Sequence, residues 1–328
     1  RTECYWQPQY GSSPLPYPEA VACTRRALED SVDRHFVSDV PVGIFLSGGM
    51  DSTALVALAR ARGVADIQTF CISFDEQAFN EGALAERTAK HFGTKHHDWR
   101  LTAREARTLV AEFLQSVDQP SNDGFNTYCV AKFARQHGMK VVLSGLGGDE
   151  LFGSYPSFRK IPQLLRAHRM ARWLGPARRG LANCATHISR DNRVQRLAAF
   201  MQSDGGPLAA YWAMRGYFTP RESLRLVEHL TGKPAGLDER ELLTASLPVL
   251  PCIEDTVSYL ETTRYMRHQL LRDSDVFSMA HGLELRVPLA DRKLLDAVNQ
   301  IPANMRLAAG KRLLCDAVPE IPEWIANA

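Results

Sequence analysis

The stretch "VGIFLSGGMDSTALVALA" (Val42–Ala59) decides the fold, because it combines an apolar run, a glycine turn and the start of a helix. Its first five residues are apolar on both faces, which is typical of a central strand in a parallel sheet. The helix after the turn is expected to end near Gly63, which has the position of a left-handed cap. A strand that leads through a tight turn into a helix is the repeating unit of α/β proteins.

Other stretches before residue 155 repeat this alternation. "IQTFCISF" (67–74) and "KVVLS" (140–144) predict strands, and "KHHDWRL" (95–101) predicts a shorter one. "EGALAERTAKHFG" (81–93) predicts a helix that closes on glycine. Thr102 and Glu105 form a capping box for a further helix. The alternation predicts an open α/β sheet of parallel strands, covered by helices on both faces.

The two ends of the chain have different patterns from this middle part. Residues 1–18 carry several prolines and no helical period, so they are interpreted as a linker that precedes an α/β core over 19–155. From Pro156 onward the strand pattern disappears, and stretches such as "IPQLLRAHRMARWLG" have helical spacing. We therefore expect a largely helical part over 156–328.

Composition narrows the class of protein. The chain has 328 residues, 45% of them hydrophobic and 23% charged, which is ordinary for a globular protein with a sizeable core. A net charge of +2 gives no bulk attraction to nucleic acid, and no apolar run approaches the ~18 residues of a membrane span. Seven scattered cysteines without a C-x-x-C pair fit a reducing compartment. We expect a cytoplasmic protein with neither nucleic-acid nor membrane partners.

The glycine turn "SGGMDS" (47–52) has the features of an anion-binding loop. Gly48 and Gly49 permit a tight turn with outward-facing N–H groups, and the hydroxyls of Ser47 and Ser52 complete a nest at a helix start. A Walker loop would add a lysine for the terminal phosphates, but here Asp51 occupies the turn. Since a carboxylate repels a polyphosphate unless a cation lies between them, Asp51 implies Mg²⁺.

This combination favours a loop that holds the β- and γ-phosphates together as departing pyrophosphate, so that the α–β bond breaks and an adenylate remains. The alternative is a glycine turn with no ligand. The stretch "VVLSGLGGDELFGSYPSF" (141–158) weakens that alternative, because an apolar strand is again followed by glycines and an acidic pair, Asp149 and Glu150. Two such turns at one sheet edge can hold a metal–pyrophosphate from two sides.

Four motifs in a fixed order connect the sequence to a known family: "FLSGGMDS" (45–52), "LSGLGGDELFGSY" (143–155), "MAHGLELRVPLAD" (279–291) and "GKRLL" (310–314). They resemble the synthetase domain of glutamine-hydrolysing asparagine synthetases and kindred amidotransferases, including β-lactam synthetase. The resemblance covers nearly the whole chain. It implies a sheet of the pyrophosphatase-loop type, similar to adenine nucleotide alpha-hydrolases, and one ATP-pyrophosphatase domain over 19–328.

The resemblance also implies roles for individual residues. Lys311 stands where the family has a lysine that neutralises charge developing on the phosphates and the acyl centre. Asp51 and Asp149 would bind Mg²⁺, and Glu150 completes the expected catalytic set. The residues expected to bind ATP and pyrophosphate are Leu46, Ser47, Gly48, Gly49, Asp51, Ser52, Ile72, Ser144 and Gly145. Without the resemblance, Lys311 would be interpreted as an exposed lysine on the last helix.

The expected acceptor pocket consists of Leu146, Glu284 and Arg286. Glu284 and Arg286 alternate along one extended segment and therefore share a face, where they either shape the pocket or pin the loop. Arg272 and Asp275 either join this network or form a surface salt bridge.

Leu146 departs from the family pattern, because asparagine synthetases that resemble this chain usually have glutamate there. That glutamate is thought to handle protons as ammonia attacks the acyl-adenylate, and the loss of such a group costs about 10²–10⁴-fold in rate. Three explanations remain open. Another carboxylate (Glu150, Asp123 or Glu284) takes over, the acceptor supplies its own group, or activity is weak or absent. An apolar pocket floor also fits an acceptor other than aspartate.

The glutaminase of the family is missing from this sequence. Family members begin with a catalytic N-terminal cysteine, and Cys4, inside the linker-like segment, does not qualify. We expect a fragment, truncated at its C-terminus as well, whose residues 1–18 connect to a glutaminase domain of the same polypeptide. The expected partners are that domain, ammonia and a small-molecule carboxylate, with a homodimer left open.

The leading hypothesis is an ATP-dependent amidoligase with Mg²⁺, which converts a carboxylate to an acyl-adenylate and pyrophosphate before ammonia displaces AMP. Two other classes stay open. A thiolating or lysine-adding tRNA ligase shares the first motif, but the near-neutral charge and "MAHGLELRVP" oppose it. A degenerate nucleotide-binding module that regulates a partner is supported by Leu146 and opposed by the retention of Asp51, Asp149 and Lys311.

Overall fold

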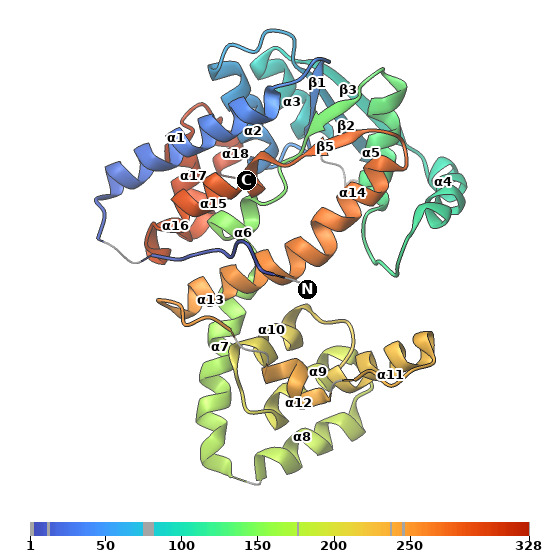
Figure 1. Ribbon diagram of the computed structural model, residues 1–328, viewed down its shortest axis with the longest axis vertical. Helices are drawn as coiled ribbons and strands as arrows, with labels where there is room; N and C mark the ends of the chain where they lie inside the picture. The colour runs from blue at the N-terminus through green and yellow to red at the C-terminus, as the bar shows by residue number, and fades with distance from the viewer. Residues whose placement is uncertain are drawn as a thin grey trace. The chain divides into compact units, whose positions relative to one another are not determined.

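The computed structural model of the chain describes residues 3–11, 14–74, 82–175, 177–236, 238–244 and 247–327. The chain forms two compact units. The first unit combines Arg1–Ser154 with Glu261–Ala328, and the second consists of Tyr155–Leu260. The first unit holds a β-sheet with helices on both sides, whereas the described residues of the second form helices and loops (Figure 1).

The sheet of the first unit has five strands in the order β3-β2-β1-β4-β5, and every pairing is parallel. The strands are β1 (Val42–Phe45), β2 (Gln68–Phe74), β3 (Lys95–Leu101), β4 (Val141–Leu143) and β5 (Glu284–Arg286). The predicted open parallel α/β sheet is therefore confirmed. The fifth strand lies inside the part that was expected to be largely helical, at the segment of Glu284 and Arg286 that was expected to be extended. Three residues on a half-exposed edge carry too little periodicity to predict that this segment joins the sheet.

Helices cover both faces of this sheet (Figure 1). One face is covered by α1 (Tyr17–Phe36), α2 (Met50–Ala61) and α3 (Gly82–Phe92), and the other by α4 (Ala103–Ser116), α5 (Phe125–Gln136) and α14 (Leu271–Met279). Leu28, Ile44 and Leu55 are fully buried on the first side, and Phe70 and Val142 on the second. Burial of these apolar faces fixes the positions of the strand ends.

The C-terminal residues return to the first unit and complete it. Besides α14 they form the π-helix η3 (Glu261–Leu270), the 3₁₀ segments η4 (Pro288–Ala290) and η5 (Ala309–Lys311), and helices α15 (Arg292–Val298), α16 (Ala303–Arg306), α17 (Arg312–Ala317) and α18 (Glu323–Ala326). Both α15 and α17 pack against α1. The expected helical part over 156–328 thus belongs to two different units, divided after residue 260.

The linker-like N-terminal segment also has contacts within the first unit. The indole nitrogen of Trp6 donates a hydrogen bond to Asp296 Oδ1 at 2.9 Å, and the backbone N–H of Gly11 donates to the Asn299 carbonyl at 3.0 Å. This segment therefore lies along α15 and the residue that follows it.

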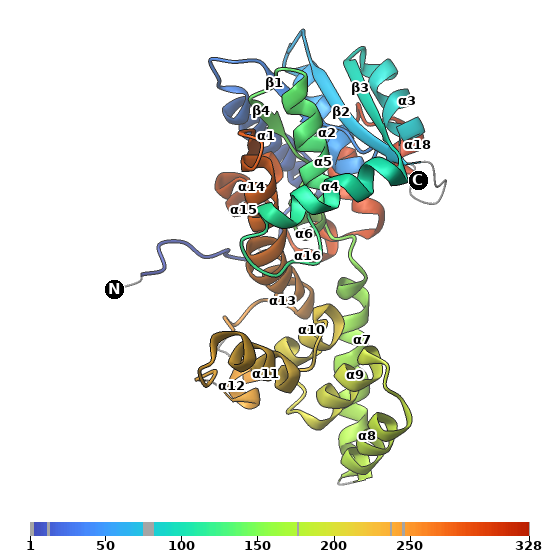
Figure 2. The same ribbon diagram turned by 90° about the vertical axis from the view of Figure 1, so that its right-hand side faces the viewer.

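The second unit is built around α10 (Pro207–Arg215), which packs against α7 (Pro156–Ala171), α9 (Asn192–Gln202) and α13 (Ile253–Leu260). Figure 2 shows α7, α9 and α10 next to one another. The remaining elements are η2 (Arg172–Leu174), α8 (Ala177–Ile188), α11 (Pro220–Thr231) and α12 (Glu239–Thr244). Ala210 and Tyr211 of α10 are buried in this packing.

Two local predictions are confirmed. Thr102 and Glu105 form the reciprocal capping box at the start of α4, and Gly63 adopts a left-handed φ of 82° at the end of α2. Across the described residues, none of the helices combines the length and the apolar character that crossing a bilayer requires.

Candidate active site

Two loops meet at the carboxyl edge of the sheet, where the strand order changes direction. β1 ends at Phe45 and leads through residues 46–49 into α2, and its neighbour β4 ends at Leu143 and leads through 144–147 into α6 (Gly148–Phe152). Since β2 lies on one side of β1 and β4 on the other, the strand order reverses between β1 and β4. A crevice at such a switch point is the usual ligand site of open α/β sheets.

The first loop is held by its own backbone and hydroxyl groups. Gly48 has a φ of +77°, and a Cβ there would lie 2.9 Å from the backbone nitrogen of Ala85. The Gly49 N–H donates to Ser47 Oγ at 3.3 Å, and the Ser52 hydroxyl donates to the Gly49 carbonyl at 3.1 Å. The loop is thus preformed at the start of α2, as an anion nest requires.

Glycines in the second loop let it close onto the first. A Cβ at Gly145 would lie 2.8 Å from the backbone nitrogen of Ser52. A Cβ at Gly148 would overlap the carboxyl group of Asp51. Because both positions lack a side chain, the start of α6 lies directly against the turn that carries Asp51. The sequence showed the glycines of each motif, but not that they contact the other loop.

We expect Gly148→Ala to separate the two loops. Its methyl group must displace Asp51, which should lower the free energy of unfolding by about 1–3 kcal/mol and the rate of any reaction at this site by about 10²-fold. Urea denaturation and turnover measure the two effects. Gly180→Ala in α8 is the control, because no atom lies within 4 Å of the added Cβ. The control should be neutral or slightly stabilising, and equal behaviour of the two variants would contradict the close packing.

Lys311 brings the acidic residues of both loops together. Its Nζ lies 2.7 Å from Asp51 Oδ1 and 2.6 Å from Asp51 Oδ2, and 2.5 Å from Asp149 Oδ1. The Ser154 hydroxyl donates a further hydrogen bond to Asp149. The lysine side chain is 8% exposed, against 15% for Asp51 and 33% for Asp149. Two carboxylates from separate loops therefore share one largely buried cation.

The backbone of Lys311 is strained. Among the described residues it is the one non-glycine with a positive φ, at φ 51° and ψ 40°, directly after Gly310 at φ 70°. A side chain in this left-handed region costs about 1 kcal/mol or more. Such conformations persist where the surroundings require them, and here the strain places the amino group between the two carboxylates.

Burial and unequal charge shift the pKa values of this cluster. Desolvation raises the pKa of Asp51 to about 6, with Asp149 adding repulsion and Lys311 opposing both. Burial disfavours the charged lysine, but the two carboxylates outweigh it and raise the pKa of Lys311 above its usual value. One cation thus faces two carboxylates, and a second cation at this place would be favourable.

We expect the raised pKa of Asp51 to make stability depend on pH. Between its usual pKa of 3.8 and its folded value of about 6, the folded state binds more protons at Asp51 than the unfolded state does. The free energy of unfolding should therefore fall as pH rises through this window, by up to about 1.4 kcal/mol per pH unit from this group. Asp51→Asn removes this component, so urea denaturation of both proteins at pH 4.5, 5.5 and 6.5 isolates it. If the free energy of unfolding of the wild type rises with pH relative to that of the variant, the raised pKa of Asp51 is contradicted.

The donor groups at this edge suit Mg²⁺. Carboxylate oxygens are ligands that this ion prefers, and it usually takes one or two of them together with water and substrate phosphates. In the part of the chain that the structure describes, no cluster of three or more His, Cys, Asp or Glu side chains could hold a metal ion. An ion held by Asp51 and Asp149 would therefore need phosphate oxygens or water to complete its ligands.

The other predicted nucleotide-site residues occupy the same sheet edge or its strands. The Leu46 N–H donates to the Phe70 carbonyl at 2.9 Å, and the Ser144 N–H donates to the Arg286 carbonyl at the same distance, so both extend the strand pairing. Ile72 lies in β2 opposite Trp99, and its side chain packs against the apolar cluster under α4 and α5. A contact with a nucleotide would involve its backbone, as expected.

Glu150 and Leu146 flank the site on the second loop. Glu150 is 1% exposed, in the short helix α6 next to Asp149, whereas Leu146 is half-buried. A carboxylate this deeply buried beside the acidic cluster is a candidate for proton transfer.

Glu284 and Arg286 contact each other and the end of α1. The Arg286 Nε lies 2.7 Å from Glu284 Oε1, which agrees with their predicted common face. Arg286 Nη1 also donates to the carbonyls of His35 and Val37, both at 2.8 Å. These contacts pin β5 to α1, one of the two roles expected. Arg272 does not join them, since its Nε donates instead to Asp273 at 3.0 Å.

Sequence reasoning missed Ser154, whose hydroxyl contacts Asp149, and the left-handed conformation of Lys311. For Ser154 the motif gave no signal, because the residue follows α6 rather than the glycine turn. For Lys311 the signal is weak, since Gly310 before it indicates a turn but not the conformation of the next residue.

Comparison with known proteins identifies relatives of the chain. The family described as asparagine synthase matches residues 24–326. Glutamine-hydrolyzing asparagine synthetase 1 of Bacillus subtilis (strain 168) is 30% identical over 311 residues, which cover 92% of this chain and 48% of that protein. Glutamine-hydrolyzing asparagine synthetase 3 of the same organism is 27% identical, with coverage of 92% and 46%.

A protein with a different name is also similar. "Amidase chyE" of Penicillium rubens is 26% identical over 329 residues, which cover 88% of this chain and 47% of that protein. The chain spans about half the length of the curated relatives it matches.

Proposed function

The chain belongs to the asparagine synthase family, and on that premise we propose that it is the synthetase part of an ATP-dependent amidoligase. The proposed reaction joins a carboxylate to the AMP portion of ATP, releases pyrophosphate, and then replaces AMP with ammonia. The observation that carries this proposal is the cluster in which Lys311 contacts Asp51 and Asp149 from two separate loops.

Each part of the cluster has a proposed task. The N–H and hydroxyl groups of the first loop would hold the β- and γ-phosphates, with Ser144 and Gly145 along the nucleotide and the backbone of Leu46 and Ile72 near the adenine. Lys311 would neutralise charge that develops on the leaving pyrophosphate and the acyl centre. A fixed cation in a water-poor site stabilises such charge more than water does.

Asp51 and Asp149 are the residues that would hold Mg²⁺. When bound, the ion would neutralise phosphate oxygens and orient the departing pyrophosphate. Lys311 contacts both carboxylates and so links the two loops that would hold the ion.

The acceptor is proposed to be a small carboxylate that lies near Leu146, with Glu284 and Arg286 supporting the pocket wall through β5. Because Leu146 cannot transfer a proton, we propose that buried Glu150 handles the proton released by ammonia, or that the acceptor does so. Ammonia is proposed to come from glutamine hydrolysis in a domain of the same polypeptide. The names of the two Bacillus subtilis relatives describe them as glutamine-hydrolyzing, which supports glutamine as the source.

The proposal is tested by following ATP in the presence of ammonium chloride and a panel of carboxylic acids. Formation of AMP and pyrophosphate that depends on one of the acids is the expected result. Release of ADP and phosphate with every acid would contradict α–β cleavage, since the nucleotide loop would then act on the terminal phosphate.

Leu146 also favours a second candidate, an ATP-binding module that regulates a partner without turnover. The two candidates differ in one measurement. ATP binding by calorimetry together with no AMP formation, in the full-length protein supplied with glutamine, would favour the regulatory module. AMP formation that is abolished by Asp51→Ala would exclude the regulatory module.

A further inference from the structure

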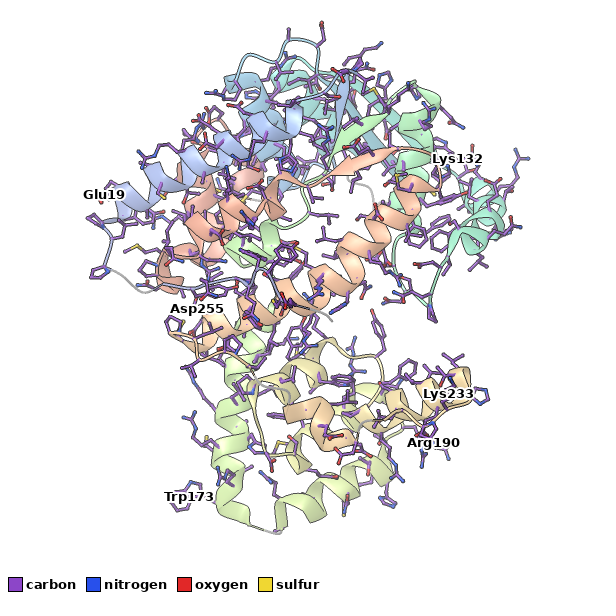
Figure 3. All side chains as sticks on the ribbon, in the orientation of Figure 1. Glu19, Lys132, Trp173, Arg190, Lys233 and Asp255 are labelled. Atoms are coloured by element: carbon purple, nitrogen blue, oxygen red, sulfur yellow. The ribbon has the colours of Figure 1, made fainter. Side chains whose placement is uncertain are left out.

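Positive charge is concentrated on four consecutive helices of the second unit. Residues 156–215, which contain α7 to α10, include eleven lysines and arginines but two acidic residues, Asp191 and Asp204. The whole chain has a net charge of +2, so the rest of it is acidic. Many of these side chains are exposed, among them that of Arg190, which Figure 3 labels at the right-hand side of the second unit. Others line a cavity.

The cavity has a volume of about 410 Å³ and lies between α7, α9 and the end of α10. Four basic side chains line it: Lys160 from α7, Arg193 and Arg196 from α9, and Arg215 from α10. No aspartate or glutamate is among its lining residues. Spacings of three to four residues place Lys160 on one face of α7 with Leu164, and Arg193 with Arg196 on one face of α9.

The protein itself orients two of these cations. Arg196 donates to the carbonyls of Ala213 at 3.3 Å and Tyr217 at 3.0 Å. The guanidinium of Arg215 lies over the ring of Tyr155, 4.2 Å from its centre. Both arginines are therefore held at the cavity by contacts with the protein, and the printed partners of Arg196 are neutral carbonyl groups.

The other two cations are available to a ligand. Within the described part of the chain, the side chains of Lys160 and Arg193 have no hydrogen bond or ion pair. Like charges that converge without a counter-ion repel one another, so an anion in the cavity would be stabilising. The first turn of the 16-residue helix α7 also lines the cavity and adds the partial positive charge of its N-terminus.

Apolar groups complete the wall of the cavity. Leu164, Leu197 and Met214 lie beside the basic side chains. A wall that is basic in one part and apolar in another matches a ligand with an anionic head and a hydrocarbon body. Inorganic ions alone would leave the apolar part in contact with water.

We propose that this cavity binds an organic anion, in which a carboxylate or phosphate monoester is attached to a short apolar body. Lys160 and Arg193 contact the anionic head, Arg196 adds to the local field, and Leu164, Leu197 and Met214 contact the body. The site lies within the second unit and is separate from the cluster around Lys311. It does not depend on the proposed ligase activity.

Isothermal titration of the chain tests the site with hexyl phosphate and hexanoate as probes. We expect saturable binding of at least one probe, and an increase of about tenfold in Kd for Lys160→Gln and for Arg193→Gln, because each loses a charge-assisted contact. Whichever probe binds more tightly identifies the head group.

The matched control is Arg159→Gln, which removes the same charge from the neighbouring residue of α7 but lies outside the lining of the cavity. It should leave Kd within twofold. Absence of binding by both probes would overturn the proposal, as would equal weakening in all three variants. If hexanol binds as tightly as hexyl phosphate, the proposal that the cations bind the anionic head is wrong. If inorganic phosphate binds as tightly as hexyl phosphate, the proposal that the apolar wall contacts the ligand body is wrong.

Discussion

Lys311→Met is expected to lower the proposed acceptor-dependent pyrophosphate release by about 10³-fold, because a cation directed at developing charge is lost from a buried site. Methionine keeps the length and much of the volume of the side chain. The two carboxylates that contact the lysine then face each other without a counter-ion. Single-turnover assays with saturating ATP measure the loss in kcat.

Arg312→Gln is the matched control, since Arg312 directly follows the lysine and its side chain is 71% exposed. It should keep activity within twofold. Circular dichroism and ATP titration show whether the methionine variant still folds and binds nucleotide. A folded Lys311→Met protein that retains more than about a tenth of the wild-type rate would exclude the transition-state role of the lysine.

Asp51→Asn is expected to reduce the same rate by about 10³-fold or more, because it removes one of two proposed Mg²⁺ ligands as well as the partner of Lys311. Asparagine keeps the shape of the side chain and one oxygen, so the contact of Gly148 with residue 51 remains. We expect the Mg²⁺ concentration for half-maximal activity to rise, and titration with Mg²⁺ at fixed ATP measures it.

Asp33→Asn on α1 controls for the loss of an aspartate, since its exposed carboxylate pairs with Arg62 away from the sheet edge. The double variant of Asp51 and Lys311 should lose little more activity than either single variant, as residues that act as a unit are not additive. If the fold losses in rate of the two single variants multiply in the double variant, the two residues act independently, which would contradict their contact in the cluster.

Much of the first unit could be predicted from the sequence because its strands are buried on both faces. The apolar run before Ser47 and the run before Ser144 identified neighbouring strands, and their glycine turns gave the edge of the sheet. The capping residues Thr102 and Glu105 fixed a helix start to the residue. In each case a local requirement of the backbone determined the residue type.

The division of the helical part could not be predicted in this way. One uninterrupted helical pattern covers residues 256–280, yet the boundary between the units falls after Leu260, inside it. Helical periodicity gives the buried face of a helix but not the unit that covers this face. The segment that carries Glu284 and Arg286 was expected to be extended, but its place in the sheet was not predicted, since its pairing with β4 is a long-range contact.

The site was predicted in composition but not in arrangement. Asp51, Asp149 and Lys311 followed from motif chemistry and from the resemblance, and the structure places them in contact. That Lys311 itself bridges both carboxylates depends on a strained backbone and on the return of the chain from the second unit. Neither the strained backbone nor the return of the chain produces a periodic pattern in the sequence.

This return of the chain has a consequence during synthesis on the ribosome. Both proposed nucleotide loops emerge before the ammonium group that faces them, which follows Asp149 by about 160 residues. An unfinished polypeptide would carry the phosphate-binding turns without the group proposed to drive cleavage. Translation must therefore have passed Lys311 before the proposed cleavage of ATP can occur.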